Sequence, residues 1–153
     1  MSTSSVVVRA MAYSDLDAVM VTEEQSYAFP WTRGIFSDCL RVGYYCRVLE
    51  KDGIIAGYAV MSFGAQEAHL LNICVRTNQR GHSYGRLLLQ DVLAAAKSLG
   101  ADMMLLEVRP SNVAAVRLYE SMGFNEIGVR KDYYPAERGR EDALMFALAL
   151  PAP

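Results

Sequence analysis

The spacing of hydrophobic residues predicts a chain that alternates between strands and helices. Residues 6–10 form a short, mostly apolar run that is typical of a strand. Three more runs are rich in β-branched and aromatic residues, at residues 44–50, 54–63 and 67–75. Only short turns, such as Lys51-Asp52-Gly53, separate these runs, so we expect them to form an antiparallel meander.

Polar residues mark the starts of two helices between the first strand and the meander. Ser14 is expected to be an N-cap, because Asp15 and Asp17 follow it and suit the positive end of a helix. This helix should run to about Tyr27. Thr32 predicts the N-cap of a second, shorter helix that ends near residue 40.

A longer helix is predicted between residues 83 and 99. Its apolar side chains recur on one face, at Tyr84, Leu88, Val92, Ala95 and Leu99. Gly100 then suits the left-handed position that commonly follows a helix.

The last third of the chain repeats the alternation. Residues 103–108 form a near-continuous apolar run, as expected of a strand covered on both faces. Pro110-Ser111-Asn112 is expected to cap a helix that runs to about Met122, and two final strands follow near residues 124–133 and 142–150. The resulting order, β-α-α-β-β-β-α-β-α-β-β, predicts an α/β fold with helices on the faces of a mixed sheet.

Composition narrows the class of protein. The 153 residues predict a single domain over residues 1–153, long enough to bury its own core. A net charge of −2 with scattered basic residues argues against nucleic-acid binding. The chain has neither a long apolar run nor a signal-peptide pattern, so we expect a cytoplasmic protein that does not bind membranes. The three cysteines match no zinc-site spacing, so we expect no bound metal.

Residues 72–89 combine a strand, a basic loop with two glycines and an amphipathic helix. Free N–H groups at a helix N-terminus bind anions such as pyrophosphate, and Arg80 and Arg86 would add charge-assisted contacts. An ordinary turn is the competing explanation. The spacing of Gly81 and Gly85 fits neither the P-loop nor the dinucleotide fingerprint, which excludes those two kinds of site.

The hexapeptide Arg80-Gly81-His82-Ser83-Tyr84-Gly85 resembles the acyl-CoA-binding motif R-G-x-G-x-[GA] of the GNAT acetyltransferases. The element order also matches that family, so the resemblance covers nearly the whole chain. It implies the GNAT fold, a mixed central sheet of six to seven strands flanked by about four helices. It also implies acetyl-CoA as co-substrate, bound through the hexapeptide and the following Arg86.

One position departs from the family motif, because Ser83 stands where the family has its middle glycine. A side chain there would crowd the pyrophosphate or strain the backbone by roughly 1 kcal/mol or more. Alternatively, the Ser83 hydroxyl donates a hydrogen bond to a phosphate oxygen. We expect the change to tune the affinity for acetyl-CoA rather than abolish the site.

Glu107 and Tyr119 are the candidate acid–base residues. Glu107 lies at the end of the apolar strand, and Tyr119 lies on the next helix, spaced with Ala115 and Met122 so that it faces the sheet. A carboxylate and a phenol placed in this way can point into one cleft. From the pattern alone, an ion pair for Glu107 and a core position for Tyr119 stay open.

Residues 106–124 are closely similar to a bacterial branch of the family, the N-acetyltransferases that modify the N-terminal alanine of the small-subunit ribosomal protein numbered eighteen. Further similar stretches are residues 28–31, 70–75, 131–135 and 139–148. By this resemblance, Glu107 is the general base and Tyr119 the general acid. The resemblance also implies that acetyl-CoA contacts one strand and one asparagine, at Ile73, Cys74, Val75 and Asn112.

The same resemblance implies that the acceptor is a protein N-terminus and that the partner is a small-subunit ribosomal protein. It assigns peptide binding to four aromatic residues, Phe29, Trp31, Tyr133 and Tyr134. For residues 28–31, a packed corner between two helices is the competing explanation. We expect the Val75 N–H to stabilise the carbonyl oxygen, and Cys74 to pack rather than act as a nucleophile. His69 and His82 receive no chemical role of their own.

Two other functions stay open. A GNAT enzyme that acetylates a small amine would be favoured by an acidic substrate pocket. A non-catalytic acyl-CoA-binding module would lack the base or the acid, whereas Glu107 and Tyr119 are both present.

Overall fold

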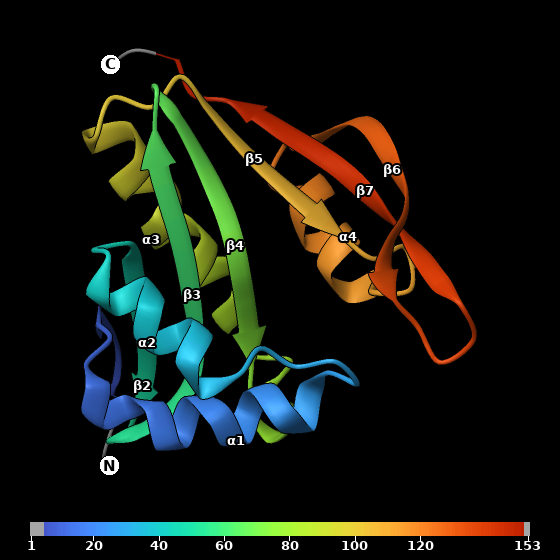
Figure 1. The fold of residues 1–153 in the computed structure, drawn as a ribbon. Coiled ribbons are helices and arrows are strands. Elements are labelled where there is room, and N and C mark those ends of the chain that lie inside the picture. Colours follow the sequence, from blue (N-terminus) through green and yellow to red (C-terminus); the bar gives the residue numbers. More distant parts are fainter. Residues whose placement is uncertain (1–4, 152–153) are drawn as a thin grey trace. The chain divides into compact units, whose positions relative to one another are not determined.

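Helices and strands follow one another in the order that the hydrophobic pattern predicts. The computed structural model describes residues 5–151 (Figure 1). Its strands are β1 Val6–Ala10, β2 Tyr45–Lys51, β3 Ile54–Gly64, β4 Glu67–Val75, β5 Met103–Val108, β6 Asn125–Pro135 and β7 Arg140–Ala149. Its α-helices are α1 Leu16–Ser26, α2 Arg33–Arg41, α3 Tyr84–Ser98 and α4 Val113–Ser121.

The strands of the described residues form a seven-stranded sheet in the order β1-β2-β3-β4-β5-β7-β6. β4 and β5 pair in parallel, with His69 opposite Leu105 and Leu70 opposite Leu106. The pairs β1–β2, β2–β3, β5–β7 and β6–β7 are antiparallel. This mixed sheet, accompanied by four helices, confirms the predicted α/β architecture.

The chain divides into two units, and each unit has its own apolar core. The first unit comprises residues 1–62 and 72–95, and the second comprises residues 63–71 and 96–153. Fully buried side chains of the first unit include Val19, Phe36, Val48, Tyr58, Leu88 and Leu89. Buried side chains of the second unit include Leu70, Met104, Leu106, Phe124 and Phe146. The single domain expected from the chain length stays a prediction.

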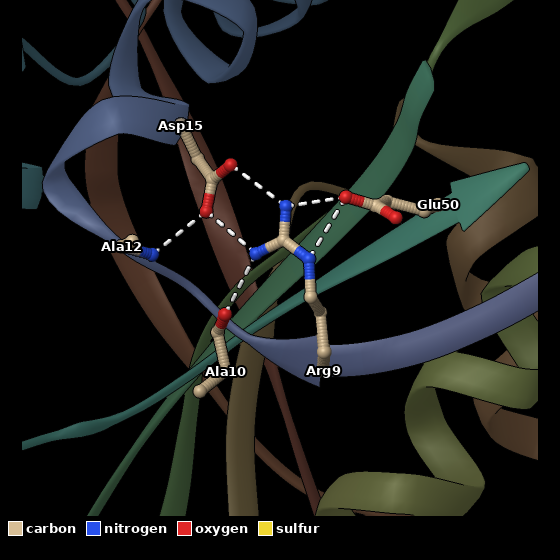
Figure 2. A network of polar contacts seen from close by, with 5 residues as sticks. All are labelled: Arg9, Ala10, Ala12, Asp15 and Glu50. Carbon is tan, nitrogen blue, oxygen red and sulfur yellow. Dashed lines mark hydrogen bonds and ion pairs between the residues drawn. The ribbon is translucent and has the colours of Figure 1, made fainter. Parts of the chain in front are cut away.

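The start of α1 differs from the prediction. Tyr13–Asp15 forms one turn of 3-10 helix, so Ser14 is not an N-cap and α1 begins after this turn. The buried carboxylate of Asp15 accepts hydrogen bonds from the Ala12 N–H at 2.7 Å and from two Arg9 nitrogens at 2.8 Å each (Figure 2). Because these bonds hold the chain before α1 in a tight turn, the α-helix begins later than expected.

Buried and partly exposed residues alternate along β5, so the prediction that both faces of this strand are covered was wrong. Buried residues are Met104, Leu106 and Val108, and partly exposed residues are Met103, Leu105 and Glu107. This period of two places Glu107 on the less covered face of β5.

The buried face of α3 also differs at its C-terminal end. Leu99 lies beyond the helix and is 50% exposed, whereas Leu93 and Ala96 are buried. Gly100 has a φ of 87°, and its N–H donates to the Lys97 carbonyl at 3.0 Å. The left-handed residue predicted after this helix is therefore confirmed.

Candidate functional site

In the first unit, β4 ends with Ile73, Cys74 and Val75, the residues expected to contact acetyl-CoA. A Cβ on Gly57 would lie 2.8 Å from the Cys74 carbonyl oxygen, so a glycine is needed for β3 to approach β4 this closely. The buried Cys74 thiol donates to the Ser26 hydroxyl at 3.3 Å, which agrees with the packing role expected for this cysteine. The Tyr27 hydroxyl donates to the Ile73 carbonyl at 3.2 Å.

The loop after β4 leads to the N-terminus of α3 through two left-handed residues. Gly81 has a φ of 87° and Ser83 a φ of 64°, so the backbone strain expected at Ser83 is present. The Nε of Arg80 donates to the Val75 carbonyl at 3.2 Å, which ties the loop to the end of the strand. The first N–H groups of any α-helix lack partners within the helix. A cationic loop that ends at such N–H groups fits the pyrophosphate of an acyl-CoA.

The rings of His82 and Tyr84 stack in this loop with their centroids 5.4 Å apart. Tyr84 is buried, whereas His82 is exposed. Gly85, the last residue of the family motif, and the following Arg86 lie in the first turn of α3.

Glu23 of α1 is a buried carboxylate that sequence reasoning missed. It is only 2% exposed. Its Oε1 accepts from the Tyr58 hydroxyl at 2.7 Å and from the Asn72 side-chain amide at 3.1 Å, and its Oε2 accepts from the Trp31 N–H at 2.9 Å. Burial, followed by the neighbouring Cys74 and Glu23, raises the pKa of Tyr58 far above its ordinary value. Glu23 therefore joins α1 to β3, to β4 and to the segment before α2.

The aromatic residues of that segment differ in exposure. The Trp31 ring is partly buried and packs against Phe36 with a centroid distance of 5.1 Å, as the packed-corner explanation requires. Phe29, in contrast, is 46% exposed.

In the second unit, Glu107 lies at the end of β5 beside a histidine of β4. The His69 Nε2 and the Glu107 Oε2 are 2.8 Å apart, and the Arg130 Nε is 4.0 Å from the Glu107 Oε1. Sequence reasoning missed His69, because the contact depends on the parallel pairing of two strands far apart in the sequence. A parallel register was not among the predictions.

Tyr133 and Tyr134 lie near the end of β6 in the same unit. Their rings meet edge to face at 4.9 Å, and the Arg109 guanidinium lies 4.4 Å from the centre of the Tyr134 ring. Burial, followed by the charge of Glu107, raises the pKa of Tyr134 to about 12. Tyr133 is 43% exposed, so it presents more surface than its neighbour.

The segment between β5 and α4 is held by Glu141 of β7. The carboxylate accepts from the Arg109 guanidinium at 3.1 Å and from the Ser111 N–H and hydroxyl at 3.0 Å each. Although desolvation acts in the opposite direction, the bonds from Ser111 and Arg109 lower the pKa of Glu141. The Asn112 Oδ1 accepts from the Ala115 N–H at 3.3 Å, which confirms the predicted cap of α4.

Tyr119 lies on α4 and is 5% exposed. Its ring packs near Phe124 at 5.7 Å and Phe146 at 6.5 Å. The position that the sequence predicts for Tyr119, facing the sheet, agrees with these contacts. Its role as an acid stays a prediction, as does the role of Glu107 as a base.

Residues 5–151 contain no group of three or more His, Cys, Asp or Glu side chains close enough together to hold a metal ion. Within the same range, no helix is long and apolar enough to cross a membrane.

Comparison with known proteins identifies relatives over nearly the whole chain. The model of the Acetyltransferase (GNAT) family matches residues 11–124. A [ribosomal protein bS18]-alanine N-acetyltransferase of Escherichia coli strain K12 is 36% identical over 143 residues, which are 94% of this chain and 97% of that protein.

Solved structures agree with this similarity. The crystal structure of the ribosomal-protein-S18-alanine N-acetyltransferase from Escherichia coli superposes with a TM-score of 0.90 at 35% identity, and the match covers 97% of this chain and 96% of that one. The structure of yncA from Salmonella typhimurium with its cofactor acetyl-CoA has a TM-score of 0.82 at 20% identity, covering 97% of this chain and 96% of that one. The second likeness is one of fold.

Proposed function

Because the chain belongs to the GNAT acetyltransferase family, we propose that it transfers the acetyl group of acetyl-CoA to the N-terminal α-amine of a protein. We propose alanine as the acetylated residue and a small-subunit ribosomal protein as the substrate, modified in the cytoplasm. The observation that carries this proposal is the 36% identity over 94% of the chain to a [ribosomal protein bS18]-alanine N-acetyltransferase.

The loop before α3 supports acetyl-CoA as the co-substrate. Arg80 and Arg86 would neutralise the diphosphate, and the N–H groups at the start of α3 would bind its oxygens. The backbone of residues 73–75 would pair with the pantetheine arm, and the Asn112 side chain would contact the same molecule. Gly57 supports this arrangement, because it lets β3 pass within van der Waals distance of the strand end.

Acetyl-CoA supplies the acetyl group as an activated thioester, so the residues of the chain need only bind, orient and move protons. Glu107 accepts a proton from the ammonium group of the substrate through its carboxylate, directly or through a water. The Tyr119 hydroxyl donates a proton to the departing thiolate. The Val75 N–H stabilises the negative charge that develops on the carbonyl oxygen.

The ordinary pKa of the acceptor amine favours an N-terminal substrate. An α-amino group with a pKa near 7.7–8.0 is roughly a tenth deprotonated at pH 7. A lysine amine with a pKa near 10.4 is only about 0.04% deprotonated at that pH. An α-amine therefore demands several hundred-fold less of the base, and a carboxylate such as Glu107 is sufficient.

Aromatic residues support an extended peptide as the acceptor. Phe29 and Tyr133 present exposed ring surface, whereas Trp31 and Tyr134 are partly buried. Rings of this kind bury large apolar areas at a small cost in side-chain entropy, which suits recognition of the first residues of a chain.

Mass spectrometry of two peptides tests the acceptor. We expect a peptide with a free N-terminal alanine and one internal lysine to gain one acetyl group, on the α-amine. The same peptide with a blocked N-terminus is the control and should stay unmodified. Acetylation of the lysine in the blocked peptide, or of small amines alone, would contradict the proposed substrate.

A further inference from the structure

His69 is a polar residue of β4 whose ring meets the proposed base. Its Nε2 is 2.8 Å from the Oε2 of Glu107, within the ordinary range of a hydrogen bond. The side chain of His69 is 34% exposed and that of Glu107 is 14% exposed. Both residues belong to the second unit, so the contact lies within one unit.

The pairing of β4 with β5 in the sheet brings these two side chains together. β4 and β5 pair in parallel with His69 opposite Leu105. Glu107 lies two residues beyond Leu105, and residues two apart on a strand point to the same face. His69 and Glu107 are therefore diagonal neighbours on one face of two hydrogen-bonded strands, and their separation is set by the backbone register.

The direction of the hydrogen bond follows from the chemistry of the two groups. An ionised carboxylate can only accept, so the Nε2 of His69 must carry the proton and donate it to the Oε2 of Glu107. A donor fixed on a strand holds one carboxylate oxygen in place. Because the two oxygens belong to one rigid group, the orientation of the other oxygen is then fixed as well.

We propose that His69 is a positioning residue for Glu107, and that its Nε2–H holds the Oε2 so that the Oε1 accepts the proton of the substrate amine. This inference rests on the proposed function, because it takes Glu107 as the base. Without the histidine, the carboxylate would rotate about its side-chain bonds and occupy the productive orientation for a smaller fraction of the time.

Two other polar groups near Glu107 are less suited to this task. The Arg130 guanidinium is 4.0 Å from the Oε1 and its side chain is 53% exposed, so it does not make a short hydrogen bond to the carboxylate. Burial, followed by the charge of Glu107, raises the pKa of Tyr134 to about 12, so the Tyr134 hydroxyl is neutral near pH 7 and carries no charge that could orient the carboxylate.

Three variants test the proposal by steady-state kinetics with an Ala-initiated peptide. We expect His69→Leu to lower kcat about tenfold, the loss that follows when a hydrogen bond to a charged group is removed. The KM for the peptide and the Kd for acetyl-CoA should stay within about twofold, because only proton acceptance is affected. His69→Gln places an amide N–H near the position of Nε2, and we expect it to restore kcat to within about threefold of wild type. Glu67→Leu, on the same face of β4 and exposed, is the matched control and should leave kcat unchanged.

A double variant separates positioning from a purely structural role. In a Glu107→Gln background, His69→Leu should cause no further loss of kcat, because His69 contributes to the reaction only through the Glu107 carboxylate. An unchanged kcat in His69→Leu, with Glu107→Gln strongly slowed, would overturn the role of His69 and leave the proposed function intact. An unchanged kcat in Glu107→Gln would overturn the assignment of the base and, with it, the role of His69.

Discussion

Ser83 has a strained backbone conformation and is also expected to contact acetyl-CoA. Its φ of 64° lies in the left-handed region, which glycine adopts at no steric cost and other residues adopt at roughly 1–2 kcal/mol. The family motif has glycine at this position. The strain is thus a property of this chain, and the Ser83 hydroxyl is the group that could offset it when acetyl-CoA binds.

We expect Ser83→Gly to raise the free energy of unfolding by about 0.5 kcal/mol. Relief of the strain outweighs the roughly 0.4–1 kcal/mol that a glycine costs through the entropy of the unfolded chain. Urea denaturation measures this change. Ser83→Ala keeps the strain, so it should show no gain in stability, and an equal gain in both variants would contradict the explanation.

Calorimetric titration of the same two variants with acetyl-CoA tests whether the Ser83 hydroxyl contacts the bound acetyl-CoA. If the hydroxyl donates to a phosphate oxygen, Ser83→Ala should weaken binding about fivefold. An affinity unchanged in both variants would show that the hydroxyl makes no such contact.

Single residues also show how far sequence reasoning reaches. The cap of α4 could be placed at Pro110-Ser111-Asn112, because polar residues directly before an apolar helix are a local signal, and the structure shows that Asn112 is the capping residue. His69 and Glu23 could not be found, because their partners lie far away in the sequence. A glutamate in an amphipathic helix is normally a surface residue, and only the fold shows that Glu23 is buried.

At the scale of elements, Glu23 connects α1 with three other segments. Its carboxylate accepts hydrogen bonds from Trp31, Tyr58 and Asn72. Asn72 directly precedes the strand end that is expected to contact acetyl-CoA, and Trp31 lies in the segment expected to contact the peptide. One buried acceptor thus supports both parts of the first unit that are proposed to bind ligands.

We expect Glu23→Ala to lower the free energy of unfolding by about 3 kcal/mol or more, because it leaves one buried and two partly buried donors without their acceptor. Trp31 is the only tryptophan of the chain, so its fluorescence follows the unfolding in urea directly. Glu24 is exposed on the same helix, and Glu24→Ala should change stability by less than about 0.5 kcal/mol. Similar losses in the two variants would show that the hydrogen bonds of Glu23 do not stabilise the unit.

The turn between β1 and α1 depends on the ion pair of Arg9 and Asp15 (Figure 2). The hydrogen bonds from Arg9 are the main cause that lowers the pKa of Asp15 below its ordinary value of 3.8. A carboxyl group whose pKa is lowered by folding stabilises the protein above the pKa of the unfolded state. That stabilisation is lost as the pH falls through the pKa of the folded state.

We therefore expect Asp15→Asn to be less stable than wild type by about 1.5–3 kcal/mol at pH 7. The difference between the two proteins should shrink steadily as the pH falls below 3.8, because the wild-type carboxyl becomes protonated. Urea denaturation at a series of pH values measures the difference. A gap that stays constant down to pH 2 would mean that the charge of Asp15 contributes nothing.

The periodicity of apolar residues predicted the type and the order of the helices and strands well, but it predicted the residues at which they begin less well. The 3-10 turn at Tyr13–Asp15 was missed, because a bidentate pair with Arg9 decides the local conformation there. The alternating burial of β5 was missed because its side chains are apolar on both faces, so the pattern carries no period of two.

At the scale of the whole molecule, the element order sufficed to predict an α/β fold with a mixed sheet. The motif at residues 80–85 and the similarity at residues 106–124 then identified the family. The register between β4 and β5 and the division into two units were not predicted, because both depend on packing between segments far apart in sequence.

One rate measurement tests both whether this GNAT protein acetylates a protein α-amine and whether Glu107 is the base. The measurement compares acetyl transfer from acetyl-CoA to an Ala-initiated peptide by wild type and by Glu107→Gln, with acetyl-CoA binding checked for both. We predict that wild type adds one acetyl group to the α-amine and that the variant binds acetyl-CoA normally but transfers about a hundredfold more slowly or worse. A wild type that binds acetyl-CoA without acetylating the peptide would contradict the proposed function, and a variant as fast as wild type would contradict the role of Glu107 as the base.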